Sequence, residues 1–349
     1  MKAQLIIVPF LLAFALSLAV TYLTILVYRG LGIVDKSTKK DHPKHVHDKP
    51  VPRGGGIPIM FAMVFVTIAS MKLDTHLVAI LSGGLVILIL GILDDLFDLS
   101  PYLRLLGGVG ASLIVVLSGI GISFVSNPMG GVLELSNYRV VADLVAILWI
   151  TWSMNFVNMG AKGLDGQLPG VVMIAGIVMG ILSFRFVNDV TTWPSAILSF
   201  ALSGAYAGLL IFNMYPQKIM PGWGGGALGG YFLAVLSILS GAKVATALIV
   251  LGVPLMDVVY AIIRRLASGK SPVWGDDKHL HHGLLKLGWS KRKIAAFYWG
   301  MSALLGVAAL MLNSQLKIYT IVLIGVVVGG MLAWINLALS SNRPGQLSG

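Results

Sequence analysis

The chain has 349 residues, of which 57% are hydrophobic and 11% are charged, with 42 glycines and a formal net charge of +11 at pH 7. Its mean hydropathy of +0.89 excludes an ordinary soluble domain and indicates a polytopic α-helical membrane protein. Cysteine is absent, which excludes disulfides and thiolate metal sites.

Hydrophobic runs of the length that a membrane helix needs, about 20 residues, recur along the whole chain. We expect an all-α polytopic membrane protein with about eleven transmembrane helices, or ten, in a single transmembrane domain over residues 1–349. The first run is too long for the core of a signal peptide, so we expect it to be retained. The runs are 5–27, 56–71, 75–93, 105–126, 139–157, 168–185, 194–213, 227–240, 242–263, 294–312 and 318–339, of which 56–71 and 227–240 are the least regular.

Basic residues favour one side of the predicted membrane. The segment 28–55 holds seven Lys and Arg residues, so we place it in the cytoplasm, with the N-terminus outside and the C-terminus cytoplasmic. Only six of the 25 basic residues then face the other side, and anionic membrane lipids rather than nucleic acid explain the basic excess. The loops with unusual sequences all fall on the cytoplasmic face: 28–55, 94–104, 158–167, 214–226 and 264–293.

The first of these loops has features of an anion site. His47 and Arg53 precede Gly54, Gly55 and Gly56. Glycines let backbone amides approach an anion, and an arginine presents a planar fork to phosphate. An ordinary flexible loop is the alternative.

Three carboxylates end the third hydrophobic run, in GILDDLFDLS. If the helix continues to Leu99, Asp94 and Asp98 share one face at i, i+4 spacing, with Asp95 beside them. Acids at a membrane boundary are costly and repel one another, which predicts a divalent cation such as Mg²⁺ that also contacts substrate phosphates. The alternative is a helix end whose acids are simply solvated.

Two later loops also carry polar clusters. In NFVNMGAKGLDGQ, Asn155 and Asn158 share a helix face and Asp165 lies in a turn, although an Asx turn that ends the helix is the simpler interpretation. In WGDDKHLHHGLLKLGWSKRK, His279, His281 and His282 lack the i, i+4 spacing of a helical zinc site. We therefore favour phosphate contact for these histidines, with a solvated loop as the alternative.

Together these motifs resemble one known family. GILDDLFDLSPYLRLLG, HDKPVPRGGGI, NFVN…GLDG, FNMYPQKI and DDKHLHHGLLKLGWS, between about Gly32 and Arg292, are similar to the polyprenyl-phosphate N-acetylhexosamine-1-phosphate transferases. The HLHH motif and the helix count are closer to the branch that initiates O-antigen and teichoic acid than to the peptidoglycan translocase. The resemblance implies transfer of a sugar-1-phosphate from a UDP-sugar to undecaprenyl or another polyprenyl phosphate, with release of UMP, as the first membrane step of a cell-envelope glycan pathway.

The resemblance also implies roles for individual residues and a cytoplasm-facing catalytic cleft in the inner (plasma) membrane. Mg²⁺, or alternatively Mn²⁺, is the implied cofactor, a homodimer is plausible, and UDP-GlcNAc is the commonest donor, with other UDP-sugars open. The implied catalytic residues are Asp94, Asp95, Asp98 and Asp165, of which Asp94, Asp95 and Asp165 are the metal ligands. The implied substrate-binding residues are His47, Arg53, Asn155, Asn158, Lys162, Lys218, Trp223, His279, His281 and His282.

The chain departs from the family pattern at two acidic positions. Trp223 stands where the family has a metal-binding aspartate. In the Asn loop, 158–167, Lys162 stands where the family has a further aspartate, with one extra residue after Asn158. The local charge changes by about +3, which weakens binding of a divalent cation.

The departures leave three functional interpretations. In the first, the protein is an active divergent transferase in which Lys162 supplies part of the missing positive charge and Trp223 stacks on the uracil or the sugar. In the second, it binds the nucleotide sugar or the lipid phosphate without turnover. A transporter or flippase is the third, although the sequence shows neither midplane charges nor internal repeats.

Overall fold

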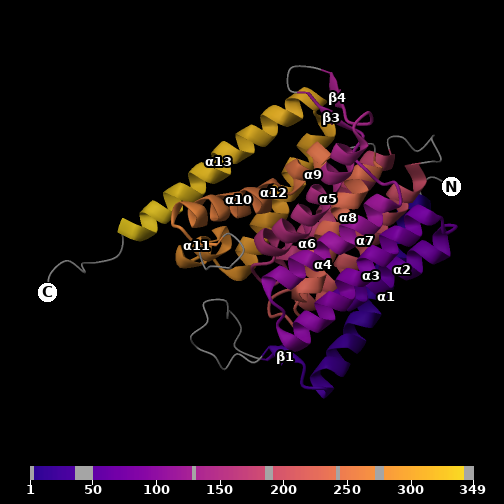
Figure 1. Cartoon of the computed structure of the whole chain (residues 1–349). Coiled ribbons are helices and arrows are strands. Elements are labelled where there is room, and N and C mark those ends of the chain that lie inside the picture. Colours follow the sequence, from indigo (N-terminus) through magenta and orange to yellow (C-terminus); the bar gives the residue numbers. More distant parts are fainter. Residues whose placement is uncertain are drawn as a thin grey trace.

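The computed structural model describes residues 4–35, 50–127, 131–184, 192–240, 244–271 and 279–341. Most of this part of the chain is helical, which confirms the all-α membrane fold (Figure 1). The helices are α1 (Gln4–Gly30), α2 (Gly56–Ser70), α3 (Thr75–Phe97), α4 (Pro101–Leu117), α5 (Arg139–Phe156), the π-helix η1 (Val157–Ala161), α6 (Gln167–Phe184), α7 (Trp193–Asn213), α8 (Gly222–Leu239), α9 (Val244–Val250), α10 (Gly252–Ala267), α11 (Leu280–Lys286), α12 (Lys291–Met311) and α13 (Ser314–Ser341). Two short antiparallel pairs complete the fold: β1 (Val34–Asp35) with β2 (Val51–Pro52), and β3 (Phe124–Ser126) with β4 (Val132–Glu134).

Each of the eleven predicted runs contains a helix, although not all are full membrane spans. Within the described ranges, eight helices are long and apolar enough to cross a membrane, and α9 with α10 makes a ninth if that bent pair is one span. Helices α2 and α4 have 15 and 17 residues. At 1.5 Å per residue they are shorter than the roughly 30 Å hydrocarbon core of a bilayer.

Two predicted runs end differently in the structure. The run 105–126 stops being helical at Leu117, and after Gly119 (φ +101°) the chain enters the β3–β4 hairpin. The run 242–263 is broken between Val250 and Gly252, where α9 and α10 meet at 83°. Gly252 and Pro254 open α10, and both residue types favour a new helix start over the continuation of an old one.

The centre of the bundle is α8, which the sequence marked as one of the least regular runs. Of its apolar window, 94% is buried inside the protein, and α8 packs against α2, α3, α5 and α6. Gly91 of α3 and Gly224 of α8 allow these two helices to touch backbone to backbone. Glycines lower the hydropathy of α8, which is tolerated because protein rather than lipid surrounds it.

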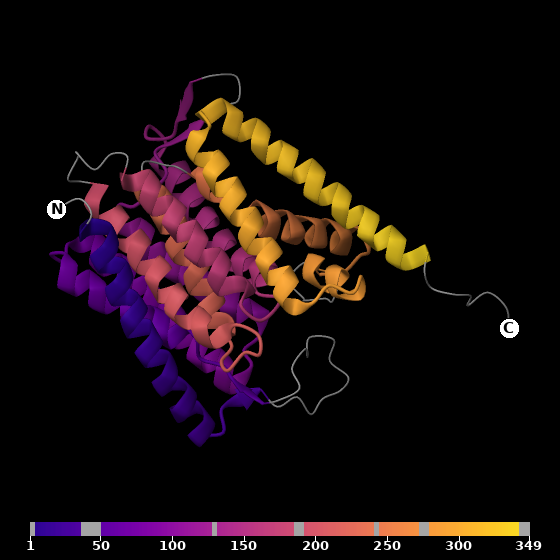
Figure 2. The same ribbon diagram turned by 180° about the vertical axis from the view of Figure 1, so that it is seen from behind.

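The start of α1 and the β3–β4 hairpin lie at one end of the bundle, and β1 lies at the other (Figure 1). Helix α13 crosses the outside of the bundle and leads to the C-terminus, as the reverse view shows (Figure 2). The ends of α1, α3, η1, α7 and α10 continue into the five loops that the sequence singled out. Contacts between these loops, described below, join them into one site.

Candidate active site

The last turn of α3 presents Asp94 and Asp95, and Asp98 lies outside it. The helix ends at Phe97, and Asp98 adopts a left-handed conformation (φ 50°) with its N–H donating to the carbonyl of Asp94 at 2.9 Å. The predicted i, i+4 pair of Asp94 and Asp98 is therefore wrong. The physical reason is the following Ser100-Pro101 start of α4, which the chain reaches only by turning sharply.

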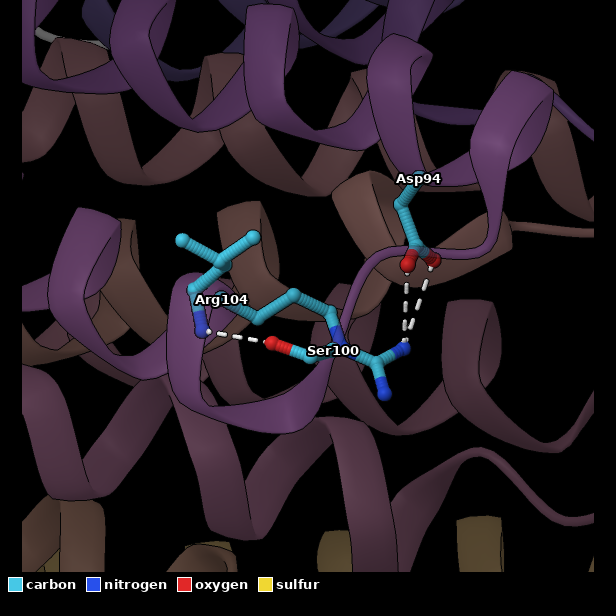
Figure 3. Close-up of polar contacts among 4 residues, drawn as sticks. Asp94, Ser100 and Arg104 are labelled. Atoms are coloured by element: carbon cyan, nitrogen blue, oxygen red, sulfur yellow. Dashed lines mark hydrogen bonds and ion pairs between the residues drawn. The ribbon is translucent and has the colours of Figure 1, made fainter.

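Asp94 forms an ion pair with Arg104 from the first turns of α4. The Nη1 atom of Arg104 lies 3.1 and 3.4 Å from the two carboxylate oxygens of Asp94 (Figure 3). Ser100 caps α4 by accepting a hydrogen bond from the N–H of Leu103, which fixes the helix start that carries Arg104 (Figure 3). Asp94 is buried, and its charge is balanced within the protein.

Asp95 differs from Asp94 because its carboxylate lacks a hydrogen-bond partner on one side. Its Oδ1 atom is buried with no partner in the structure. The backbone of Gly222 (φ +66°) lies against this carboxylate, and a Cβ at that position would come within 2.9 Å of Oδ1. Lys162 and Arg53 attract Asp95 electrostatically. A narrow crevice beside Asp95 is lined by backbone and side chains of α2, α3 and α8 and by Gly54.

The Gly54–Gly56 run packs tightly instead of forming an open anion cradle. Gly55 donates its N–H to the carbonyl of Met220 at 3.1 Å, and Gly54 (φ +108°) lies under the ring of Tyr28. Arg53 follows β2 and pairs with Asp35 of β1 at 3.0 Å, while the fields of Asp95 and Asp98 also reach it. The loop therefore places Arg53 beside the aspartates. The predicted site residue His47 lies outside the described residues.

The Asn loop begins with a π-helix. The hydrogen bonds of a π-helix span five residues where those of an α-helix span four, so η1 accommodates the extra residue after Asn158. Asn155 donates to the carbonyl of Thr151 in its own helix at 2.8 Å. Asn158 points its buried, unpartnered Oδ1 at Gly226 of α8. Lys162 ends η1, half-buried beside Asp95, and burial lowers the pKa of its ammonium to about 8, although the charge of Asp95 opposes this shift.

Asp165 lies in a turn that three other elements hold in place. Its Oδ2 accepts a hydrogen bond from the backbone N–H of Gln217 at 3.3 Å. The next residue, Gly166, donates its N–H to Asn213 of α7 at 2.9 Å and accepts from the indole of Trp299 of α12 at 3.1 Å. Asp165 is buried, and these bonds tie the Asn loop to the 214–226 loop, to α7 and to α12.

The histidine loop, which carries His279, His281 and His282, contacts the Asn loop through ring packing. The ring of His281 lies directly on the backbone of Gly163, next to Lys162. His279 stacks on His281, with ring centroids 5.7 Å apart and planes at 4°, and the ring centroid of His282 lies 4.3 Å from that of His281. Burial, with its histidine neighbours, holds the pKa of His281 well below the usual range, so this ring is neutral. The three predicted histidines therefore pack together, and His281 joins them to the Asn loop at Gly163.

Two predicted substrate-binding residues do not join this group. Lys218 is exposed, and its ammonium lies 5.9 Å from the centre of the Phe212 ring. Trp223 is 6% exposed and belongs to the hydrophobic core at the start of α8. A ring buried to this extent presents no face on which uracil can stack.

The three predicted metal ligands do not form a ready-made site. Among the residues that the structure describes, no group of three or more His, Cys, Asp or Glu side chains is arranged to hold a metal ion. Asp94 is bound by Arg104, and Asp165 accepts from Gln217. The orphaned Oδ1 of Asp95 is the atom that fits a cation, as one ligand shared with substrate phosphates.

Sequence reasoning missed two residues that shape this site. Asp257 of α10 is fully buried and bonded to His279, and a lone acid inside the apolar run 242–263 is itself a signal of function. Arg104 lies in a loop that the sequence did single out, but nothing in its spacing revealed its pairing with Asp94.

Comparisons with known proteins match this geometry to a family. Residues 77–241 match the model of glycosyl transferase family 4. A probable undecaprenyl-phosphate N-acetylglucosaminyl 1-phosphate transferase of Bacillus subtilis is 31% identical over 319 residues, which cover 88% of this chain and 85% of the relative. The decaprenyl-phosphate N-acetylglucosaminephosphotransferase of Mycobacterium tuberculosis H37Rv is 29% identical, covering 88% and 83% of the two chains. The undecaprenyl-phosphate alpha-N-acetylglucosaminyl 1-phosphate transferase of Yersinia pestis is 27% identical, covering 80% and 77%. The chain therefore belongs to glycosyl transferase family 4.

Proposed function

We propose that the protein transfers a sugar-1-phosphate from a UDP-sugar to undecaprenyl phosphate or another polyprenyl phosphate and releases UMP. The names of the relatives favour N-acetylglucosamine-1-phosphate as the transferred group. The observation that carries the proposal is the position of Asp95 between Lys162 and Arg53, with Gly222 against its carboxylate and the ring of His281 on Gly163, next to Lys162. A carboxylate between two cations at the end of a helical bundle suits phosphate chemistry better than sugar transport.

The proposed reaction needs positioning and charge stabilisation more than proton transfer. An oxygen of the lipid phosphate attacks the β-phosphorus of the donor, and the bond from that phosphorus to the bridging oxygen breaks to release UMP. The lipid phosphate is already an anion at neutral pH, so no base has to activate it. Lys162, with its pKa lowered to about 8 by burial, is mostly an ammonium at pH 7. With Arg53 it offsets the charge that accumulates on the phosphate oxygens.

We keep Mg²⁺ as the proposed cofactor, with Mn²⁺ as the alternative ion. Mg²⁺ in proteins is commonly bound by one or two carboxylates together with substrate phosphates, and Asp95 is the carboxylate that fits this role. When bound, the ion would neutralise charge on the diphosphate and on the departing UMP. At pH 7 Lys162 supplies a second share of that positive charge from the protein itself, which predicts a weaker dependence on Mg²⁺ than that of a site with three acids.

We further propose that the five loops face the cytoplasm, in the plasma (inner) membrane, with the N-terminus outside. The supporting observation is the bias of basic residues toward these loops. Only from this face does the site meet a cytosolic nucleotide sugar and a membrane-borne lipid phosphate together.

Binding without turnover is the second candidate function. It is favoured by the pairing of Asp94 with Arg104 and by the lack of a three-acid cluster among the described residues. Such a protein would hold a nucleotide sugar or a lipid phosphate on its cations and release no UMP.

UMP release by the purified protein in detergent distinguishes the two functions. Undecaprenyl phosphate is supplied with UDP-GlcNAc, UDP-GalNAc and other UDP-sugars, with Mg²⁺ or with EDTA, and Asp95→Asn is the inactive control. We expect UMP that depends on the lipid acceptor and is lost in the control. UMP release that is equal in Asp95→Asn would contradict the proposed site, and donor binding without UMP from any donor would favour the binding function.

A further inference from the structure

A buried acid outside the aspartate motif bonds directly to the histidine loop. Asp257 of α10 has a side chain with no exposed surface, and it accepts two hydrogen bonds. The backbone N–H of Leu280 donates to Oδ1 at 2.9 Å, and Nδ1 of His279 lies 3.0 Å from Oδ2. Both contacts join α10 to the start of α11, 22 and 23 residues further along the chain.

This arrangement assigns the proton on the His279 ring. The backbone N–H of Leu280 can only donate, and a carboxylate can only accept, so Nδ1 of His279 must carry the hydrogen of the second bond. The ring atom that remains for a substrate is Nε2. The bond from the backbone of Leu280 orients the buried carboxylate of Asp257, and the bond from Nδ1 then holds the imidazole of His279 against it.

The fixed ring lies where it can serve the proposed site. His279 is 7% exposed and stacks face to face on His281, which rests on Gly163 beside Lys162. The other titratable groups around it are the neutral ring of His281, His282 on the same helix, and Tyr298 of α12, whose hydroxyl lies within the field of Asp257. The hydrogen bond of the His279 ring goes to the Asp257 carboxylate.

We propose that Asp257 is a positioning residue, which holds His279 in the Nδ1–H tautomer and presents the lone pair of Nε2 to a hydroxyl or N–H group of the nucleotide sugar. The inference rests on the proposed function for its substrate, but the tautomer itself follows from the two hydrogen bonds. An asparagine at position 257 has one acceptor oxygen for two donors. It must therefore oppose its amide N–H₂ to either Leu280 or His279, which releases the ring or reverses its tautomer.

The first arm of the test reads the tautomer without any activity. Nitrogen-15 NMR of the full-length protein labelled at histidine, at a pH where the imidazoles are neutral, locates the hydrogen on each ring, and His279→Gln identifies the signal. We expect His279 with hydrogen on Nδ1 and a bare Nε2 in the unmodified protein. A hydrogen on Nε2 there would overturn the proposal, whether or not Asp257 variants fold.

The second arm is a double-mutant cycle on kcat/KM for UMP release, with UMP affinity as its substitute if no donor turns over. We expect Asp257→Asn and His279→Gln each to lower the value by about 10- to 100-fold, as for other groups that orient a functional histidine. The double variant should fall no further than the worse single variant, because Asp257 acts through His279. Ser183→Ala, which removes a buried hydrogen bond to Ser240 far along α6, is the control that lowers Tm without changing kcat/KM. If the fold-losses in kcat/KM of the two single variants multiply in the double variant, or if Asp257→Asn keeps full kcat/KM, the proposal is overturned. A failure of the proposed function has a different sign, which is the absence of turnover in the unmodified protein.

Discussion

Replacing Arg104 with glutamine tests how the buried charge of Asp94 is held. The Arg104 and Asp94 side chains are 25% and 5% exposed, and their charged atoms lie 3.1 Å apart. At an effective dielectric constant of about 20, two unit charges at this distance attract by about 5 kcal/mol, from which desolvation subtracts a large part. Removal of one partner of a fully buried pair costs about 3–5 kcal/mol, and the partial exposure of Arg104 reduces this figure. We expect Arg104→Gln to lower the free energy of unfolding by about 2–3 kcal/mol.

The assay is reversible unfolding in mixed detergent micelles, with the thermal midpoint as a second readout. Arg139→Gln is a matched control, because Arg139 pairs with Asp143 at 3.8 Å on an exposed face of α5. That pair should contribute about 0.5 kcal/mol or less. The double-mutant cycle with Asp94→Asn should show a coupling of about 1–2 kcal/mol. Equal effects of Arg104→Gln and Arg139→Gln, or no coupling to Asp94, would refute the ion pair and return Asp94 to the list of free metal ligands.

Three further predictions follow from neighbouring residues. His281 is buried and neutral in the folded protein but takes up a proton below its ordinary pKa of about 6.5 when unfolded, so the protein loses stability as pH falls below that value. At pH 5.5 the free energy of unfolding is about 1.4 kcal/mol lower than at pH 7.5 because of His281. Measurements of Tm against pH should show that His281→Gln removes this part of the pH dependence. The control His76→Gln, at an exposed histidine, should keep it. Gly163→Ala places a Cβ in the ring of His281 and should separate the Asn loop from the histidine loop, which lowers kcat/KM. Gly110→Ala, with open space around it, should behave as the unmodified protein. Normal kinetics in Gly163→Ala would mean that the contact between Gly163 and His281 does not matter. Trp223→Ala should cost about 3–5 kcal/mol of stability because the ring is buried in the core, and an unchanged Tm with a raised KM for the donor would instead restore the stacking role.

The lengths of the hydrophobic runs and the charge pattern were sufficient to predict the helical membrane fold, but not which runs form full, unbroken membrane spans. Every predicted run contains a helix, because apolar runs near 20 residues have few other ways to satisfy their backbone in a membrane. The central helix α8 was underrated because its glycines lower its hydropathy, and they do so at contacts with other helices such as Gly224 on Gly91. The break between α9 and α10 depends on packing around Gly252 that a hydropathy window does not register.

For the site, sequence motifs located the loops but not the partners of individual side chains. The structure places Lys162 beside Asp95, and the ring of His281 on Gly163, the residue after Lys162. The backbone turn at Asp98, the capture of Asp94 by Arg104 and the burial of Trp223 are decided by tertiary contacts, which spacing in one sequence does not reveal. Asp257 was hidden by the apolar residues on either side of it, which bury its carboxylate against the histidine loop.

The central claim is that this site moves a sugar-1-phosphate from a nucleotide to a lipid. Its most direct test follows the β-phosphorus of the donor, by incubating the purified protein with undecaprenyl phosphate, Mg²⁺ and UDP-GlcNAc labelled with ³²P at that atom. We predict that the label moves into the organic phase as a lipid diphosphate sugar, in equal amount to the unlabelled UMP released, and that Asp95→Asn does not support this transfer. Label that stays in the aqueous phase while the lipid phosphate is unchanged, across the panel of UDP-sugars, would contradict the account.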